Sequence, residues 1–457
     1  MLLPQLELAC LVMILLPLRA NALHSLANPS LLASIASNGP TFPVFDPAAP
    51  STELATVPLS TRDDVKRAID RSYKVLPDWR DGTTGMERGR ILQKWSSLIQ
   101  DHADSIATIM TLESGKPRKE SLGEVNYATS FLDYYAAEAI RPSSAGGGFL
   151  TPTPFANPRG KVLAQHQAVG VTGLITPWNF PAAMITRKVG PALAAGCTAI
   201  VKPSEWTPLT AVALVELARQ AGLPKDVVQL VTPDTQHTPE VGLELCTNPL
   251  VRKISFTGST RVGRLLMQQS NLQRMSLELG GNAVFCVLED ADLEVAVSAA
   301  MASKFRHAGQ TCVCADRFLV HESVYDEFLS RFKEAVESQL VVGPGMESST
   351  TMGPLISEEA VRGVHSKVTE AIGSGARLVT GGEKLESIGT HFYAPTILSD
   401  VSTTSSIWST ETFGPVAAVR SFATEEEALD IANDSNTGLA AYFCTRDLKR
   451  AWYWADR

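Results

Sequence analysis

The chain has 457 residues, 44% hydrophobic and 19% charged, with a formal net charge of −8. This length allows two or three globular domains, and the acidic balance without a Lys/Arg-rich run excludes a typical nucleic-acid-binding protein. The seven cysteines are odd in number and scattered, which excludes a disulfide framework and a structural zinc site. We therefore expect a small-molecule substrate, with no nucleic acid and no metal.

Residues 1–24 are a candidate targeting leader. The apolar run Leu8–Leu18 is too short to span a bilayer as a helix. It is followed by Ala20-Asn21-Ala22, which fits a small-x-small cleavage site, but the only charge before the run is Glu7 rather than a basic residue. A secretory peptide, an organelle leader and a mis-assigned start stay open. We favour a mitochondrial or cytoplasmic location and expect no membrane segment in the mature domain.

Helical patterns dominate residues 62–140. In the segment 62–79, apolar residues recur every three or four positions, and the segments 86–112 and 120–140 read similarly. The next stretch, 143–157, is rich in Gly, Ser, Pro and Thr and is expected to be a loop or linker.

From residue 162 onward, short apolar runs alternate with helices, which is typical of parallel sheets covered by helices. Thr207 is expected to cap a helix whose first residue is Pro208, because proline needs no donor there. The expected fold is α/β with two doubly wound Rossmann-like domains. The predicted strands are 169–176, 198–201, 227–231, 253–256, 275–279, 283–288, 318–321, 377–379 and 439–443. The predicted helices are 182–195, 207–222, 293–305, 322–338, 358–372 and 425–432.

Three motifs offer catalytic chemistry. Cys312, in Gly309–Cys314, is a nucleophile if its surroundings favour the thiolate, although most loop cysteines are inert. Glu278 lies between two leucines at a strand end, where poor solvation suits a general base; a strand-edge Glu facing solvent is the plainer interpretation. Asn179 follows the first strand of the alternating region and offers an amide to an oxyanion, or serves only the turn.

Three further loops suit a nucleotide. Phe256–Gly263 joins a strand to a helix, and glycine with exposed amides there makes a pyrophosphate seat, although the usual GxGxxG fingerprint is absent. Lys202–Glu205 follows another strand and could bracket ribose hydroxyls. Glu411–Pro415 is a turn with one acid and one aromatic ring. Taken singly, each is explained as well by ordinary loop chemistry.

In combination and in this order, these motifs resemble the aldehyde dehydrogenase superfamily. The similarity runs from about Phe42 to the last residue through TPWNFP, KPSE, FTGSTRVG, LELGG, GQTC and ETFGP. The segments MITRKVG and KFRxxGQTCVC look most like the succinate-semialdehyde dehydrogenase branch.

The resemblance implies roles residue by residue. The thiolate of Cys312 attacks the aldehyde, the amide of Asn179 holds the oxyanion, hydride passes to the cofactor, and Glu278 activates water against the resulting thioester. A carboxylate at Glu205 favours NAD over NADP by repelling the extra phosphate. The implied cofactor contacts are Thr176, Trp178, Lys202, Ser204, Glu205, Gly258, Ser259, Gly263, Leu279, Glu411 and Phe413.

Two arginines bear on the substrate. By the same resemblance, Arg187 and Arg306 hold a distal carboxylate, so that succinate semialdehyde is oxidised to succinate; for each, a solvated helix arginine is the alternative. Cys314 is a redox candidate, able to form a reversible disulfide with Cys312, or else a spectator. His307 and Asp316 stand where the family usually has Asn.

The resemblance also implies a domain order. Residues 25–140 and 162–280 form an NAD-binding domain, 141–161 a linker or oligomerisation hairpin, and 281–457 the catalytic domain. Family members continue past Arg457 with a further strand, so we expect an incomplete catalytic domain, in what is otherwise a homo-oligomer. The alternatives are a dehydrogenase for another semialdehyde or an uncharged aldehyde, and an inactive truncated product.

Overall fold

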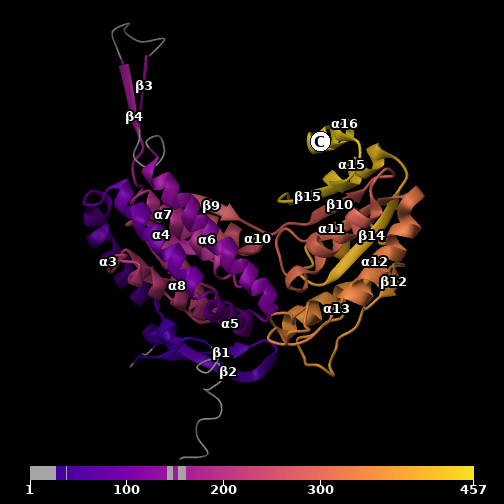
Figure 1. Ribbon diagram of the computed structural model, residues 1–457, viewed down its shortest axis with the longest axis horizontal. Coiled ribbons are helices and arrows are strands. Elements are labelled where there is room, and N and C mark those ends of the chain that lie inside the picture. The colour runs from indigo at the N-terminus through magenta and orange to yellow at the C-terminus, as the bar shows by residue number, and fades with distance from the viewer. Residues whose placement is uncertain (1–26, 36, 38, 142–147, 153–160) are drawn as a thin grey trace, which may run out of the picture. The chain divides into compact units, whose positions relative to one another are not determined.

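The computed structural model describes residues 27–35, 37, 39–141, 148–152 and 161–457. Its chain divides into two compact units, one made mainly of residues 50–113 and 121–278, the other mainly of 279–457 with 114–120. Figure 1 shows the first unit in indigo to magenta and the second in orange to yellow. The candidate leader 1–24 lies outside the described residues.

The first unit contains most of the helices before residue 141 and a parallel sheet after it. Its elements are η1 (Pro29–Ile35), β1 (Thr41–Asp46), β2 (Ala49–Pro58), α3 (Arg62–Arg80), α4 (Gly85–Asp101), α5 (Ala103–Ser114), α6 (Arg118–Ile140), β3 (Gly148–Pro152), β4 (Lys161–Gln165), β5 (Val171–Ile175), α7 (Ala183–Ala194), β6 (Thr198–Lys202), α8 (Pro208–Gln220), β7 (Val228–Leu230), α9 (Thr238–Thr247), β8 (Val251–Thr257), α10 (Thr260–Gln269) and β9 (Arg274–Glu278).

The sheet of the first unit has five parallel strands in the order β7-β6-β5-β8-β9. Both β5 and β6 are buried along their whole length, as their mainly apolar sequences favour. The order reverses between β5 and β8, and right-handed crossovers therefore place α7 and α8 on one face and α9 and α10 on the other. The doubly wound α/β prediction is confirmed for this sheet.

Two local predictions for this unit are wrong. The segment 86–112 is two helices rather than one, because α4 ends at Asp101 and His102 leaves helical geometry before α5. Thr207 precedes Pro208 as expected, yet its side chain makes no capping hydrogen bond. A third prediction is wrong in part, because residues 148–152 of the expected loop 143–157 form β3, which pairs with β4 as an antiparallel hairpin.

The second unit is built on a six-stranded sheet in the order β12-β13-β14-β11-β10-β15, parallel except for β12. Apolar side chains from this sheet and from α11, α12 and α13 form one buried core. Its elements are β10 (Ala283–Val287), α11 (Leu293–Phe305), η2 (Arg306–Gly309), β11 (Ala315–His321), η3 (Glu322–Val324), α12 (Tyr325–Gln339), α13 (Glu358–Gly373), β12 (Arg377–Thr380), β13 (Thr396–Ser399), α14 (Ser406–Ser409), β14 (Val416–Phe422), α15 (Glu425–Asn433), β15 (Ala441–Cys444) and α16 (Leu448–Ala455).

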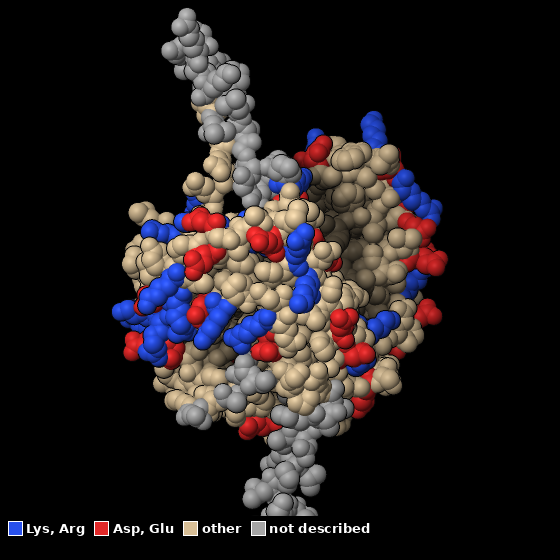
Figure 2. Space-filling model, turned by 60° about the vertical axis from the view of Figure 1, so that its left-hand side comes forward, with Lys and Arg blue, Asp and Glu red and all other residues tan. Residues whose placement is uncertain are grey.

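The surface carries charges of both signs. Figure 2 shows Lys and Arg side chains with Asp and Glu beside them on the face that is viewed. Among the described residues, no helix combines the length and the apolar character needed to cross a membrane.

Candidate active site

The predicted site residues fall into two sets, one in each unit, and each set is described within its own unit. In the first unit most of them lie on the loops at the carboxyl ends of β5, β6 and β8, around the point where the strand order reverses, whereas Arg187 lies in α7, Gly263 in α10 and Glu278 at the end of β9. Open parallel sheets bind their ligands at this place. The backbone N–H of Thr176, just after β5, donates to the carbonyl oxygen of Lys202 at the end of β6, at 3.0 Å. The first two loops are thereby joined.

Lys202 and Glu205 form a pair on the loop after β6. The Lys202 ammonium lies 3.3 Å from a Glu205 carboxylate oxygen, and the lysine side chain is almost fully buried. Burial lowers the pKa of Lys202, while the charge of Glu205 opposes that shift. Ser204 completes the loop by accepting from the N–H of Trp206 through its hydroxyl. A cation and an acceptor are thus held side by side.

The turn between β8 and α10 is open because Gly258 has no side chain. A Cβ added there would lie 2.5 Å from the ring of Phe256. Ser259 caps α10 by accepting from the N–H of Val262, and the N–H of Gly258 donates to the carbonyl oxygen of Glu278 at 3.1 Å. Gly263 is buried one turn into the helix. A close backbone at a helix start fits the phosphates of a dinucleotide.

Asn179 and Glu278 have contrasting surroundings. Asn179 is only 5% exposed, on the loop between β5 and α7 that also carries Trp178. Glu278, at the end of β9, is exposed, which agrees with the plainer interpretation of a strand-edge Glu facing solvent and not with a poorly solvated carboxylate. Its flanking leucines are themselves only half-buried, because β9 is the edge strand of the sheet.

Glu278 and Arg187 line one cavity of about 450 Å³ in the first unit. The guanidinium of Arg187 lies 5.6 Å from the ring centre of Phe131, a cation–π distance, and donates to the sulfur of Met184. The adjacent Lys188 lines the same cavity and donates to the Ser255 hydroxyl at 3.0 Å. Burial lowers the pKa of Lys188 to about 8.

In the second unit, the predicted residues lie at the amino ends of β10, β11 and β14. These strands are parallel neighbours, so the segments that precede them meet at one edge of the sheet. The first segment contains Gly281, the second Cys312 and the third Glu411. A Cβ added to Gly281 would lie 2.7 Å from the carbonyl oxygen of Cys312, which is half-buried. Leu279 is half-buried at the start of this unit.

The loop before Cys312 has an unusual backbone. His307, Ala308 and Gly309 have successive positive φ angles of 51°, 53° and 74°. Non-glycine residues rarely adopt this region, and they are found there at functional sites held by their surroundings. The N–H of His307 donates to Glu120 at 2.9 Å. Burial and nearby Lys116 and Arg306 lower the pKa of His307 well below its usual range.

The buried side chain of Gln310 holds the same loop. Its amide nitrogen donates to the carbonyl oxygens of His307 and Pro354, and its oxygen accepts from the N–H of Ile356 at 2.9 Å. Further along, the Tyr442 hydroxyl donates to the carbonyl oxygen of Val313 at 2.7 Å. Cys312 therefore lies on a segment held from both sides.

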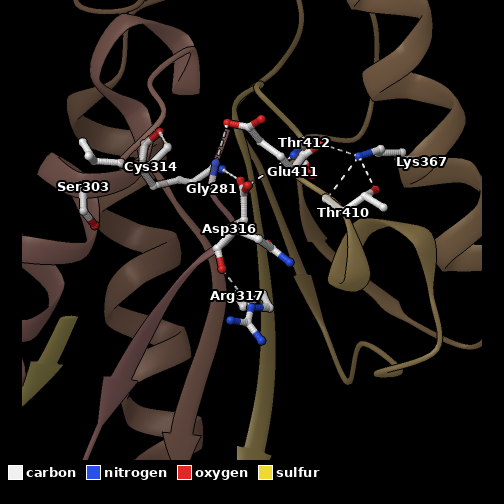
Figure 3. A network of polar contacts seen from close by, with 12 residues as sticks. Gly281, Ser303, Cys314, Asp316, Arg317, Lys367, Thr410, Glu411 and Thr412 are labelled. Atoms are coloured by element: carbon white, nitrogen blue, oxygen red, sulfur yellow. Dashed lines mark hydrogen bonds and ion pairs between the residues drawn. The ribbon is translucent and has the colours of Figure 1, made fainter. Parts of the chain in front are cut away.

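A polar network surrounds the turn that contains Thr410, Glu411 and Thr412 (Figure 3). Asp316 accepts from the N–H of Thr412 at 3.2 Å and pairs with the fully buried Lys304 at 2.7 Å. A carboxylate oxygen of Glu411 accepts from the N–H of Gly281, at the long distance of 3.5 Å. Phe413 itself has a φ of 50°.

Nearby charges and burial also affect the hydrogen bonds and the protonation of this turn. Lys367 donates to the carbonyl oxygens of Thr410 and Glu411. Burial, with the negative charge of Asp316 added, raises the pKa of Glu411 to about 7. Asp316 is thus paired rather than isolated.

Cys314 and Arg306 complete the second set. Cys314 is buried, donates to the carbonyl oxygen of Lys304 at 3.1 Å, and has its thiol pKa raised by burial to about 11. This environment weighs against a reactive thiolate, and its disulfide with Cys312 stays a prediction. Arg306 is exposed and lines a cavity of about 720 Å³ with Glu120 and Arg331.

Sequence reasoning missed the charged residues that support these loops, among them Lys188, Lys304 and Lys367. The only available signal was their position: Lys188 and Lys304 both occur within apolar helical patterns, where a lysine must find a partner or lose solvation.

A model of the aldehyde dehydrogenase family matches residues 35–457. The chain belongs to the aldehyde dehydrogenase family. Among its relatives, a succinate-semialdehyde dehydrogenase [NADP(+)] of Escherichia coli is 48% identical, covering 91% of this chain and 84% of the relative. The mitochondrial succinate-semialdehyde dehydrogenase of Mus musculus is 46% identical, covering 91% and 78%.

Solved structures agree with the family and the fold. The crystal structure of succinate-semialdehyde dehydrogenase from Burkholderia pseudomallei has a TM-score of 0.89 and 46% identity, covering 94% of this chain and 89% of that one. This chain is therefore an NAD(P)-dependent aldehyde oxidoreductase with the mixed α/β aldehyde dehydrogenase fold, and it acts on a small aldehyde.

The preference for NAD over NADP that we predicted is wrong. Relatives from Escherichia coli and Schizosaccharomyces pombe are named as NADP(+) enzymes. The physical argument failed because it treated Glu205 as an isolated charge. In this aldehyde dehydrogenase, the Lys202 ammonium lies 3.3 Å from the Glu205 carboxylate, and a paired carboxylate repels a phosphate less than an isolated one.

Proposed function

We propose that this aldehyde dehydrogenase oxidises succinate semialdehyde to succinate through a thioester on Cys312. The observation that carries the substrate is the set of relatives named succinate-semialdehyde dehydrogenase, which share 45–48% identity over 87–92% of the chain. Arg187 and Arg306, each of which lines a cavity, support this substrate, because a guanidinium can bind a carboxylate through two parallel hydrogen bonds.

The chain's own residues divide the work. The Cys312 thiolate forms a bond to the aldehyde carbon, and the amide of Asn179 stabilises the negative oxygen that results. After oxidation, Glu278 accepts a proton from water, which attacks the thioester and releases the acid together with the Cys312 thiolate. The exposure of Glu278 gives that water ready access.

The cofactor would be held by the loops described above. Lys202 and Glu205 suit the adenosine ribose, the turn at Gly258 and Ser259 suits the pyrophosphate, and Glu411 with Phe413 suits the nicotinamide ribose. When bound, NAD(P) supplies the acceptor for the hydride that leaves the aldehyde carbon. The homo-oligomer expected from the family stays a prediction.

The test is steady-state formation of reduced cofactor by the purified chain. Succinate semialdehyde, glutarate semialdehyde and butanal are compared, each with NAD and with NADP. We expect the highest kcat/KM for succinate semialdehyde. Cys312→Ala should abolish turnover, while Cys444→Ala, which changes another half-buried cysteine, should retain it. A preference for butanal would contradict the substrate, and turnover by Cys312→Ala would contradict the mechanism.

A further inference from the structure

Two of the three helices that follow the site loops of the first unit, α7 and α8, lack side-chain caps of their own, whereas α10 is capped by Ser259. The first backbone N–H groups of any helix have no partner within the helix, and a side chain just before it usually accepts from them. Before α7 that position is Ala182, which has no acceptor, and before α8 it is Thr207, which makes no such bond. Both helix starts therefore need an acceptor from elsewhere.

Two buried glutamates from another part of the chain supply it. One oxygen of Glu124, on α6, accepts from the N–H groups of Ala182 and Ala183 at 2.9 and 3.2 Å. The two oxygens of Glu113, on α5, accept from Leu209 and Thr210 at 2.7 and 2.9 Å. The side chains are 3% and 1% exposed.

The two arrangements are similar in chemistry, although Glu124 uses one oxygen for both contacts and Glu113 uses two. In each, a buried carboxylate accepts two adjacent N–H groups at the positive end of a helix, which compensates in part for the loss of hydration. Figure 1 shows α5, α6, α7 and α8 in the same unit. Because hydrogen bonds to a charged acceptor are about twice as strong as neutral ones, each glutamate fixes the first turn of its helix most firmly when it is ionised.

The loops that these contacts fix differ in function. Asn179, the proposed oxyanion amide, lies three residues before Ala182. The contact of Ala182 with Glu124 therefore fixes the end of the loop that contains Asn179. Lys202 and Glu205 lie on the short loop that ends at α8, where Glu113 binds. A displacement of about 1 Å at such a site can cost roughly a hundredfold in rate.

We infer that Glu124 and Glu113 are separate positioning residues, Glu124 for the oxyanion loop and Glu113 for the adenosine-binding loop. The inference rests on the proposed function, and it assigns different kinetic consequences to two residues with the same burial and the same type of contact. If the two residues only stabilised the fold, substitution of either one would have the same effect on the kinetics.

The experiment compares Glu124→Gln with Glu113→Gln, each the control for the other. At Glu113, where each carboxylate oxygen accepts from one N–H, Gln keeps the size but turns an amide N–H toward a backbone donor. At Glu124, where one oxygen accepts from both N–H groups, Gln can keep both hydrogen bonds and removes only the charge. Burial raises the pKa of Glu113 to about 8, with the nearby Glu124 adding to the shift, so assays are run at about pH 9, where the carboxylate is ionised. The readouts are kcat, the cofactor KM, and the dissociation constant of the reduced cofactor from its fluorescence.

We expect Glu124→Gln to lower kcat roughly tenfold or more while the cofactor KM changes less than about threefold. Glu113→Gln should raise the cofactor KM and the dissociation constant roughly tenfold while kcat changes less than about threefold. Parallel changes in both variants, or a lower melting temperature with unchanged kinetics, would overturn the inference.

Two additions keep the outcome decisive. If a Gln variant fails to fold, Glu124→Asp and Glu113→Asp are used instead, because Asp keeps the charge but is shorter by one methylene. Glu124→Asp should then lower mainly kcat and Glu113→Asp should raise mainly the cofactor KM, each by less than the Gln variants. If the wild type does not turn over succinate semialdehyde, the proposed function fails. The dissociation constant still tests this inference, because only the Glu113 variants should then weaken cofactor binding.

Discussion

Arg187 and Arg306 are the side chains on which the proposed substrate depends most directly. Arg187 is half-buried against Phe131 and lines the cavity of Glu278, whereas Arg306 is exposed beside a larger cavity of its own unit. Their contacts differ, but the proposal gives them one task, the binding of a distal carboxylate.

Substitution of either arginine by Ala should raise the KM for succinate semialdehyde at least tenfold. The loss of a bidentate charged hydrogen bond accounts for this size, at roughly 1.5–3 kcal/mol. The KM for butanal should change less than about threefold, because butanal has no carboxylate. Equal changes for both aldehydes would show that the arginines act on folding or on the thiol instead. Arg331→Ala, another arginine of the Arg306 cavity, is the matched control.

Glu411 should make cofactor binding depend on pH. Its pKa of about 7, raised by burial and by Asp316 against the opposing effect of Lys367 and Lys304, means that it is protonated below neutrality. A ribose hydroxyl donates better to a carboxylate than to the neutral acid. The dissociation constant of the reduced cofactor should therefore fall as pH rises from about 6 to about 8.

Fluorescence titration of the cofactor across this pH range is the measurement. Glu411→Gln cannot ionise, so its dissociation constant should stay nearly flat over the same range. Identical profiles for the variant and the wild type would show that another group is responsible.

The left-handed turn His307–Gly309 is the element on which the geometry of Cys312 depends. Gly309 has both a positive φ and no room for a side chain, since an added Cβ would overlap the carbonyl oxygen of Gly414. The contact joins the Cys312 loop to the turn that contains Glu411 and Phe413. A change at this one position should therefore disturb the nucleophile and the cofactor contacts together.

Gly309→Ala should lower the free energy of unfolding by at least about 1–2 kcal/mol and reduce kcat/KM by at least tenfold. Chemical denaturation and steady-state kinetics measure the two effects. Gly373→Ala, at a position with nothing within 4 Å of the added carbon, should change neither. Wild-type kinetics in Gly309→Ala would contradict the role of this turn.

At the scale of the whole molecule, much of the fold could be predicted because it depends on local patterns. The apolar runs of β5, β6 and β10 are buried along their length, and their alternation with helices predicted the parallel sheets. By contrast, β14 was not predicted, although it is central in the second sheet, because its two alanines give little strand signal.

Contacts between distant positions escaped prediction. Glu113 and Glu124 bind backbone groups 96 and 58 residues away, so no local spacing could reveal them, and Thr207 was given a capping role that Glu113 fills. The leucine neighbours of Glu278 left open whether its carboxylate is poorly solvated or faces solvent, and the edge position of β9 decides for exposure. Short sequence motifs predicted the candidate catalytic and binding residues, whereas tertiary packing determines the burial and the hydrogen-bond partners of those residues.

The most direct test of the central claim is to trap the intermediate on the protein. Glu278→Gln should form the thioester but hydrolyse it slowly, so incubation with succinate semialdehyde and NAD(P) followed by mass spectrometry of peptides should find one succinyl group on Cys312. The adduct should be absent without cofactor and absent in the Cys312→Ala, Glu278→Gln double variant. A succinyl group on Cys314, or no adduct on a folded chain that still reduces the cofactor, would contradict the account.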